Sequence, residues 1–245
     1  MFEQCSLLLL NYARPECMER ILAENVHLPW GDILIMDSWH LADDEYPFLW
    51  PTDPRIRCIG MDELLGQYPR ACGSMLTKSH FVCTQDDDYL VTAAGWERLF
   101  QEWDGTHIVR LVPEWCPEPQ SIKLGCGAMF DNRWLQAAWA KYLAMDPLVG
   151  EEHSREAADE AWTTFWGLQK PITGWQKYVT FLLDRNWMRA ETNEKAMSQN
   201  MDVLLNRARV RGCAQALRQA FCSSQCQTES EFPTVLQKLV KDCFG

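Results

Sequence analysis

Three consecutive aspartates, Asp86-Asp87-Asp88, are the clearest chemical signal in the sequence. Neighbouring carboxylates repel one another unless a cation lies between them. In an extended segment the side chains of residues i and i+2 point the same way, so Asp86 and Asp88 are expected to converge on one ion. Carboxylate oxygens suit Mg²⁺ or Mn²⁺ held jointly with a substrate phosphate. A solvated acidic turn is the alternative, but the triplet follows an apolar run at residues 81–84, which favours a metal site.

Polar residues also follow two earlier apolar runs. Residues 6–10 and 33–36 have the continuous apolar character of buried parallel strands, and between them Pro15 opens an amphipathic helix. Asn11 follows the first run, with Arg14 close behind, and Asp37 follows the second. In open α/β sheets, ligands bind beyond the edge where the carboxyl ends of parallel strands meet. We therefore expect these three residues and the aspartate triplet along one rim.

The remaining pattern predicts an α/β fold in which strands are concentrated in the first 130 residues and helices follow. Further strands are expected at residues 55–59, 107–112 and 125–130. Helices are expected at residues 61–77, 95–103, 132–143, 156–166 and 202–220. Strands joined by such helices favour right-handed crossovers, and hence a parallel sheet.

Composition narrows the class of protein. Of the 245 residues, 47% are hydrophobic and 23% are charged, which is typical of a globular protein. The longest apolar run, residues 7–10, is too short to span a bilayer, and the start lacks the basic residues of a signal peptide. We therefore expect a cytoplasmic protein, in host cytoplasm if the source is viral, with no membrane partner. Eleven cysteines without a CxxC pair and five dispersed histidines argue against a disulfide framework and a zinc site.

Charge is distributed unevenly along the chain. The net charge of −11 argues against a general affinity for nucleic acid or anionic lipid. Residues 185–218, however, contain seven basic and three acidic side chains, a net charge of +4. This basic segment includes Arg207, Arg209 and Arg211, which could contact phosphate, bind an acceptor or form a solvated helix face.

Several common active-site motifs are absent from the sequence. It contains no GxxxxGK[ST] loop, no GxGxxG at the first helix and no GxSxG elbow. These absences argue against a P-loop nucleoside triphosphatase (NTPase), a dinucleotide-binding enzyme and an α/β-hydrolase.

The order of the polar strand ends resembles that of the GT-A glycosyltransferases. Asn11-Tyr12-Ala13-Arg14-Pro15 is similar to their first nucleotide-contacting loop, Asp37 to their acidic residue near the base and ribose, and Asp86-Asp87-Asp88 to their DxD motif. The resemblance covers about residues 5–165. It implies a Rossmann-type, mostly parallel sheet flanked by helices. Residues 1–165 would form the nucleotide-sugar-binding core, and residues 166–245 a helical extension packed on it within a single domain.

The resemblance also implies roles for individual residues. Asp86 and Asp88 would hold Mn²⁺ or Mg²⁺ on the diphosphate of the donor. A carboxylate that deprotonates the acceptor is expected in the acidic stretch at residues 151–160, although a retaining enzyme needs no such base. The expected donor contacts are Asn11, Tyr12, Arg14, Asp37, Lys78 and Asp87. The expected base is Asp159, with Glu160 beside it. The expected acceptor contacts are Gly127, Arg207, Arg209 and Arg211.

The acceptor is expected to be DNA. The NYxRP opening and the DDDY segment are similar to the compact sugar transferases that act on hydroxymethylated pyrimidines in viral and base-modification systems. The predicted function is transfer of a sugar, with UDP as the expected nucleotide, to that hydroxymethyl group. A glycan, lipid-linked or protein acceptor is the first alternative. A sugar-1-phosphate nucleotidyltransferase is the second, although the glycine-rich loop it needs is absent after the first strand. An interaction module without catalytic activity is the third.

Overall fold

The computed structural model describes residues 1–11, 15–37, 52–61, 68–105, 107–112, 124–133 and 169–182. The chain divides into two compact units, and all the described residues except Tyr68 belong to the first, which comprises Met1–Leu65, Pro69–Leu135 and Leu168–Leu183. The helices predicted at residues 156–166 and 202–220, and nearly all of that predicted at 132–143, lie outside the described residues.

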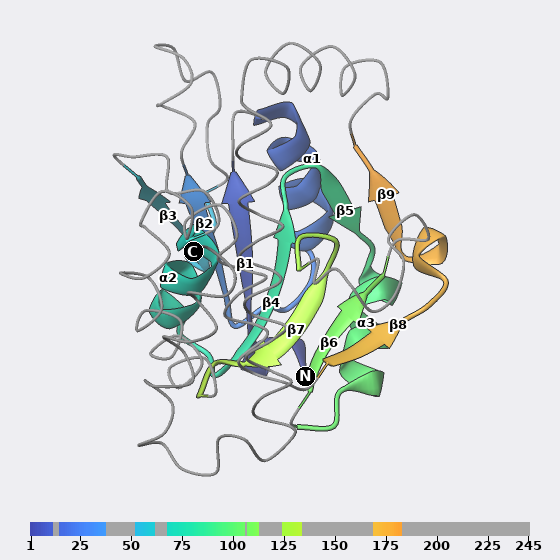
Figure 1. The fold of residues 1–245 in the computed structure, drawn as a ribbon. Coiled ribbons are helices and arrows are strands. Elements are labelled where there is room, and N and C mark those ends of the chain that lie inside the picture. The colour runs from blue at the N-terminus through green and yellow to red at the C-terminus, as the bar shows by residue number, and fades with distance from the viewer. Residues whose placement is uncertain are drawn as a thin grey trace, which may run out of the picture. The chain divides into compact units, whose positions relative to one another are not determined.

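A seven-stranded sheet forms the centre of this unit (Figure 1). Its strands are β1 (Cys5–Asn11), β2 (Asp32–Asp37), β3 (Ile56–Gly60), β4 (Phe81–Asp86), β6 (Ile108–Leu111), β7 (Ala128–Asp131) and β8 (Gln169–Ile172). They are arranged in the order β3-β2-β1-β4-β7-β6-β8, and only the two pairings that involve β7 are antiparallel. The predicted α/β fold with a mostly parallel sheet is confirmed. The buried apolar runs in β1 and β2 fit strands that are covered on both faces.

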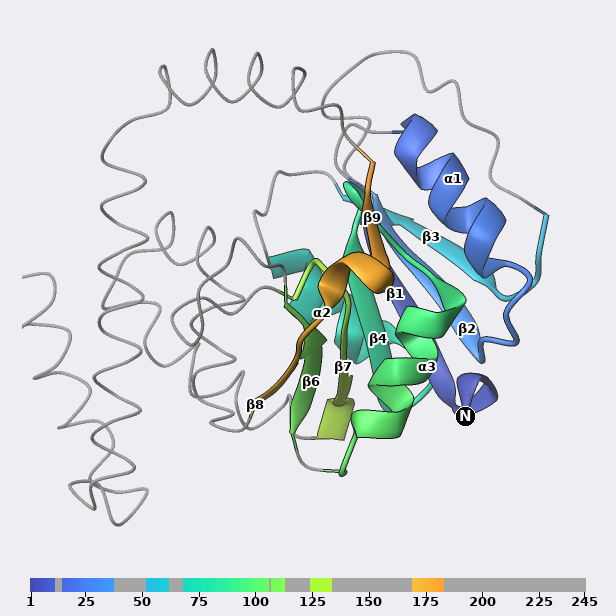
Figure 2. The same cartoon turned by 90° about the vertical axis from the view of Figure 1, so that its right-hand side faces the viewer.

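Helices cover both faces of the sheet. α1 (Pro15–Asn25) and α3 (Ala93–Glu102) lie on one face, and α2 (Tyr68–Leu76) lies on the other (Figure 2). The Thr92 side chain caps α3 by accepting a hydrogen bond from the backbone N–H of Gly95. Trp30 and Trp96 meet edge-to-face in the core beneath α1 and α3, with ring centroids 5.4 Å apart. No helix among the described residues is both long and apolar enough to cross a membrane.

The helix α2 lies close to the sheet. It was predicted from residue 61, but Met61 is not helical, because its backbone N–H donates to the carbonyl oxygen of Asp37 at 2.8 Å and extends the pairing of β3 with β2. Residues 62–67 lie outside the described residues. The close approach depends on Gly73. A Cβ at this position would lie 2.7 Å from Leu8 Cδ1 and 2.8 Å from Met36 Cγ.

Strands also occur after residue 165, which corrects the expectation that only helices follow the first 130 residues. β8 pairs with β6 in the main sheet, and β9 (Val179–Phe181) pairs with β5 (Tyr89–Val91) in a separate two-stranded sheet. Short 3-10 turns at Phe2–Gln4 and Trp175–Lys177 complete the described elements. β8 contains Gln, Lys and Pro, and therefore has no apolar run. Its extended conformation depends on distant pairing, which local sequence patterns do not report.

Candidate functional site

The predicted rim of polar residues lies at the carboxyl edge of the sheet. Asn11 lies opposite Asp37 in the pairing of β1 with β2, and Leu10 lies opposite Asp86 in the pairing of β1 with β4. Three neighbouring strands therefore end in polar residues at the same edge. Two strand spacings, about 10 Å, separate the backbones of Asp37 and Asp86. The expectation that these residues share one edge is confirmed.

Side chains on either side hold the carboxylate of Asp37 in place. Asn11 Nδ2 donates to Asp37 Oδ1 at 2.9 Å, and the Cys58 thiol donates to Asp37 Oδ2 across 3.9 Å. Cys58 keeps an exposed surface, but partial desolvation raises its pKa to about 12, with further contributions from the charge of Asp37 and from this hydrogen bond. The thiol therefore stays protonated at neutral pH. Cys58 comes from the adjacent strand β3, and no local sequence pattern indicated its contact with Asp37.

The aspartate triplet is not one extended segment. β4 ends at Asp86, and Asp87 and Asp88 form a turn into β5. The alternation argument for Asp86 and Asp88 therefore fails, because the chain turns between them. The pKa of Tyr89, which follows the triplet directly, is raised mainly by burial, then by Cys126, and also by the charges of Asp88 and Asp86.

The side chain of Gln85 holds this turn in place. Its Nε2 donates to the carbonyl oxygen of Tyr89 at 2.6 Å, and its Oε1 accepts from the backbone N–H of Val91 at 3.2 Å. The carbonyl oxygen of Asp88 accepts from the backbone N–H of Leu182 at 2.9 Å. Asp87 itself is buried, with 2% of its surface exposed. This burial fits a structural role better than the predicted contact with donor.

Arg70 supplies the positive charge that the triplet requires. Its Nη2 donates to Asp86 Oδ1 at 2.5 Å, and its Nη1 donates to Thr84 Oγ1 at 2.8 Å. The Arg70 side chain is 2% exposed, whereas that of Asp86 is 35% exposed. The sequence analysis missed Arg70 because it precedes Asp86 by sixteen residues and lies on α2. Part of the repulsion among the three carboxylates is therefore offset by the protein itself.

Gly125 and Gly127 lie beside the triplet and are both buried. The carbonyl oxygen of Gly125 accepts from the backbone N–H of Asp86 at 2.9 Å, and a Cβ at this position would lie 1.7 Å from Asp86 Oδ2. Gly127 has φ +106°, and a Cβ there would lie 2.8 Å from Val91 Cγ2. The conformation and packing of Gly127 are those of a buried turn, and its predicted contact with the acceptor stays a prediction.

The triplet offers hard oxygen donors suited to Mg²⁺ or Mn²⁺. Asp86 retains an exposed carboxylate surface, and Asp88 adds a second carboxylate near it. Within the described part of the chain, no three His, Cys, Asp or Glu side chains gather in a way that could hold a metal ion. The donor set therefore fits an ion that takes its other ligands from a diphosphate and water, rather than one enclosed by protein.

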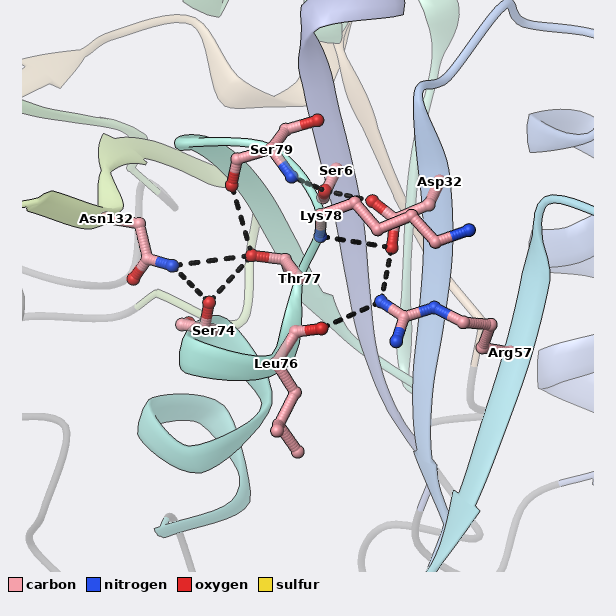
Figure 3. Close-up of polar contacts among 9 residues, drawn as sticks. All are labelled: Ser6, Asp32, Arg57, Ser74, Leu76, Thr77, Lys78, Ser79 and Asn132. Atoms are coloured by element: carbon pink, nitrogen blue, oxygen red, sulfur yellow. Dashed lines mark hydrogen bonds and ion pairs between the residues drawn. The ribbon is translucent and has the colours of Figure 1, made fainter.

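Lys78 lies at the opposite edge of the sheet. It follows α2 and precedes β4, so it lies at the amino edge, and its side chain is exposed. Its backbone N–H lies 3.4 Å from Asp32 Oδ2 at the start of β2 (Figure 3). The predicted contact of Lys78 with the donor phosphate is wrong for this reason. Seven other predicted site residues lie outside the described residues: Tyr12, Arg14, Asp159, Glu160, Arg207, Arg209 and Arg211.

Similarity to known proteins is found at the level of three-dimensional structure. No protein-family model matches the chain, and no curated protein matches its sequence. The 1–349 fragment of TarS from S. aureus superposes with a TM-score of 0.51 at 8% identity, covering 98% of this chain and 90% of that fragment. The mannosyltransferase PcManGT from Pyrobaculum calidifontis, solved with GDP-Man and Mn²⁺, gives a TM-score of 0.50 at 10% identity, covering 98% of this chain and 85% of that one.

The fold is the GT-A fold. At these low identities the similarity shows the fold alone. Longer TarS chains superpose with a TM-score of 0.50 at 11% identity, and the match covers 89% of this chain but only 43% of theirs.

Proposed function

We propose that this protein is a glycosyltransferase that moves a sugar from a nucleoside-diphosphate donor to a hydroxyl group. The observation that carries the proposal is the alignment of Asn11, Asp37 and Asp86 along the carboxyl edge of a GT-A sheet. A diphosphate nucleotide placed along this edge could reach both carboxylates, since their backbones are about 10 Å apart. Support from a protein of the same fold comes from PcManGT, which binds GDP-Man and Mn²⁺.

Different residues of the edge would contact different parts of the donor. Asp37, held by Asn11 and Cys58, would accept a hydrogen bond from the base or ribose. Asp86 and Asp88 would hold Mn²⁺ or Mg²⁺ against the diphosphate. When bound, the ion supplies positive charge that offsets the charge developing on the leaving diphosphate. In an inverting enzyme Asp159, with Glu160 beside it, would deprotonate the acceptor hydroxyl.

The donor is tested by nucleotide binding and release. Parent protein, Asp88→Ala and Asp104→Ala are incubated with Mn²⁺ and a panel of UDP-sugars and GDP-sugars, and released nucleotide is measured. Asp88→Ala should lose donor binding and turnover. Asp104→Ala should retain both, because Asp104 lies in an exposed turn where it contacts His107. The proposal fails if the parent protein neither binds nor cleaves any donor in the panel.

For the acceptor we propose the hydroxymethyl group of a modified pyrimidine in DNA. Support comes from the basic segment, whose net charge of +4 contrasts with −11 for the whole chain. Arg207, Arg209 and Arg211 would contact phosphates of the DNA backbone. A glycan or protein hydroxyl is the alternative acceptor.

A salt titration of DNA binding separates these acceptors. Each basic residue lost from a phosphate contact should lower the slope of log K against log salt by about 0.7–0.9. The double variant Arg207→Ala, Arg211→Ala should therefore show a shallower slope and retain hydrolysis of the donor. The matched control is Arg20→Ala, Lys177→Ala, which removes two exposed basic residues from the described unit. If the parent binds no DNA at low salt, the DNA acceptor is excluded in favour of the glycan or protein acceptor.

A further inference from the structure

Arg70 is a buried arginine at the edge of the candidate donor site. Only 2% of its side chain is exposed, although its partner Asp86 is 35% exposed. A buried guanidinium is stable only where acceptors surround it, and here Thr84 and Asp86 each take one of its terminal nitrogens. Thr84 and Asp86 are residues i and i+2 of β4, so their side chains project from the same face of the sheet toward α2.

The position of Arg70 is fixed by the helix that carries it. α2 is drawn against the sheet at Gly73, and its C-terminal end is held by two hydrogen bonds. Asn132 Nδ2 donates to the carbonyl oxygen of Ser74, and Arg57 Nη2 donates to that of Leu76 at 2.8 Å (Figure 3). Arg70 therefore approaches Asp86 from a helix held firmly at its far end.

Gly125 leaves the space that the carboxylate of Asp86 needs. Asp86 Oδ2 occupies the place that a side chain at residue 125 would fill, only 1.7 Å from the position of its Cβ. Oδ1 is bonded to Arg70 at the same time. The orientation that Arg70 gives to the carboxylate is therefore available only because residue 125 is a glycine.

We propose that Arg70 is a positioning residue, which orients Asp86 and offsets the charge of the aspartate triplet before metal and donor bind. This inference rests on the proposed function, because it assigns Asp86 to the metal and diphosphate. Arg70 acts through Asp86 rather than on the donor. Its guanidinium bonds Oδ1 and thereby orients the carboxylate, so the ligand would already be in place when the metal ion binds.

The test measures Mn²⁺ binding in the presence of UDP or GDP by electron paramagnetic resonance, which reports free Mn²⁺ directly. Arg70→Met should weaken Mn²⁺–nucleotide binding by about 10–100-fold, the range found when partners of metal ligands are removed. Arg70→Lys keeps the charge, but a single ammonium group cannot bond Thr84 Oγ1 and Asp86 Oδ1 as the guanidinium does. Its Mn²⁺–nucleotide affinity should therefore lie between those of the parent and Arg70→Met.

A second ion pair provides the matched control. Arg55 Nη2 lies 2.7 Å from Asp53 Oδ2 just before β3, at the amino edge of the sheet, and Arg55 also donates to the carbonyl oxygens of Val26 and Leu28. Arg55→Met should lower the melting temperature and leave Mn²⁺–nucleotide affinity unchanged, because none of these partners belongs to α2. A purely structural role for Arg70 predicts the same behaviour for Arg70→Met, so equal Mn²⁺ affinity in the parent and Arg70→Met overturns the inference.

Gly125→Ala provides a test that keeps the arginine. The new methyl group should displace the Asp86 carboxylate and weaken Mn²⁺–nucleotide binding. Gly105→Ala is its control: the φ of +88° makes that substitution strained, but a Cβ at residue 105 meets nothing within 4 Å and so leaves Asp86 in place. If Arg70→Met does not fold, normal Mn²⁺ affinity in Gly125→Ala overturns the inference. If the parent binds no nucleotide with Mn²⁺, the proposed function itself fails. If the parent binds and these variants bind equally well, only the role of Arg70 is overturned.

Discussion

Each edge of the sheet contains an ion pair between an arginine and an aspartate, and in the two pairs the opposite member is exposed to solvent. At the amino edge Asp32 is fully buried and Arg57 is 32% exposed, whereas at the carboxyl edge Arg70 is 2% exposed and Asp86 is 35% exposed. Both pairs join a strand of the sheet to an arginine at 2.5 Å. The buried member of each pair is held by protein groups, and the exposed member faces solvent. An exposed carboxylate at the carboxyl edge can meet a cation or ligand, and a buried one at the amino edge cannot.

The amino edge shows how a carboxylate is used when it serves structure alone. Asp32 accepts from the Ser6 hydroxyl, from Arg57 and from the backbone N–H of Lys78 (Figure 3). The Ser6 hydroxyl oxygen in turn accepts from the backbone N–H of Ser79 at 3.1 Å. This network ties the starts of β1 and β2 to the segment that leads into β4. It involves side chains that sequence alone would class as equally capable of binding a ligand.

Breaking the amino-edge pair should give the largest effect on stability. Asp32→Ala leaves Ser6 and Arg57 without their shared acceptor in a buried site. We expect the free energy of unfolding to fall by about 3–5 kcal/mol, as measured by urea denaturation. Nucleotide binding by the protein that remains folded should be unchanged. Loss of binding at a temperature where the variant is fully folded would contradict the division of roles between the edges.

Breaking the carboxyl-edge pair should reduce stability and binding together. Asp86→Ala leaves the buried guanidinium of Arg70 without its carboxylate, so the free energy of unfolding should fall by about 2–3 kcal/mol. Asp88→Ala should abolish Mn²⁺-dependent donor binding at a cost to stability below about 1 kcal/mol. Equal stability of the parent and Asp86→Ala in urea would show that Arg70 does not depend on this partner.

The rim could be predicted from sequence because a local pattern of residues indicates each strand and its end. An apolar run followed by Asn11, Asp37 or Asp86 defines both the strand and its carboxyl end. Arg70 and Cys58 could not be found this way, because they reach the site from α2 and β3. Nothing in the residues next to them in the sequence distinguishes them from the other polar residues of a helix or strand.

The error over Lys78 has a topological cause. A helix that connects parallel strands runs antiparallel to them, so residues that follow it lie at the amino edge. Lys78 comes after α2 (Tyr68–Leu76), whereas Arg70 lies in its first turn and therefore reaches the carboxyl edge. The choice between these two basic residues thus depends on where the helix ends. The hydrophobic pattern placed its C-terminal end near residue 77 but did not show which end served the site.

Moving α2 tests whether the two edges are coupled. Gly73→Ala brings a methyl group to 2.7 Å from Leu8 Cδ1 and should push the helix away from the sheet. Overpacking should lower the free energy of unfolding by about 1–3 kcal/mol. The better helix propensity of Ala offsets part of this, so a net loss of about 1 kcal/mol is expected. Because Arg70 moves with the helix, Mn²⁺–nucleotide affinity should also fall by severalfold. Unfolding by urea and Mn²⁺ binding measure the two effects separately, and a change in stability without a change in affinity would show that the edges are independent.

The smallest effect concerns the thiol beside Asp37. Burial, the charge of Asp37 and their hydrogen bond raise the pKa of Cys58 from 9.0 to about 12, so the thiol is protonated at about pH 8 and should react slowly with iodoacetamide. Asp37→Asn removes the charge and lowers the pKa, and each unit of that decrease raises the thiolate fraction about tenfold. Alkylation of the peptide containing Cys58, followed by mass spectrometry, should therefore be faster in Asp37→Asn. The reaction of Cys72 in the same sample serves as the control, because burial raises its pKa without any contribution from a carboxylate. A donor nucleotide bound against Asp37 should slow the reaction of Cys58 and leave that of Cys72 unchanged.

Equal rates for Cys58 in the parent and Asp37→Asn would show that the carboxylate does not control the thiol. They would then argue against the hydrogen bond between Cys58 and Asp37, which is proposed to hold Asp37 at the nucleotide end of the rim.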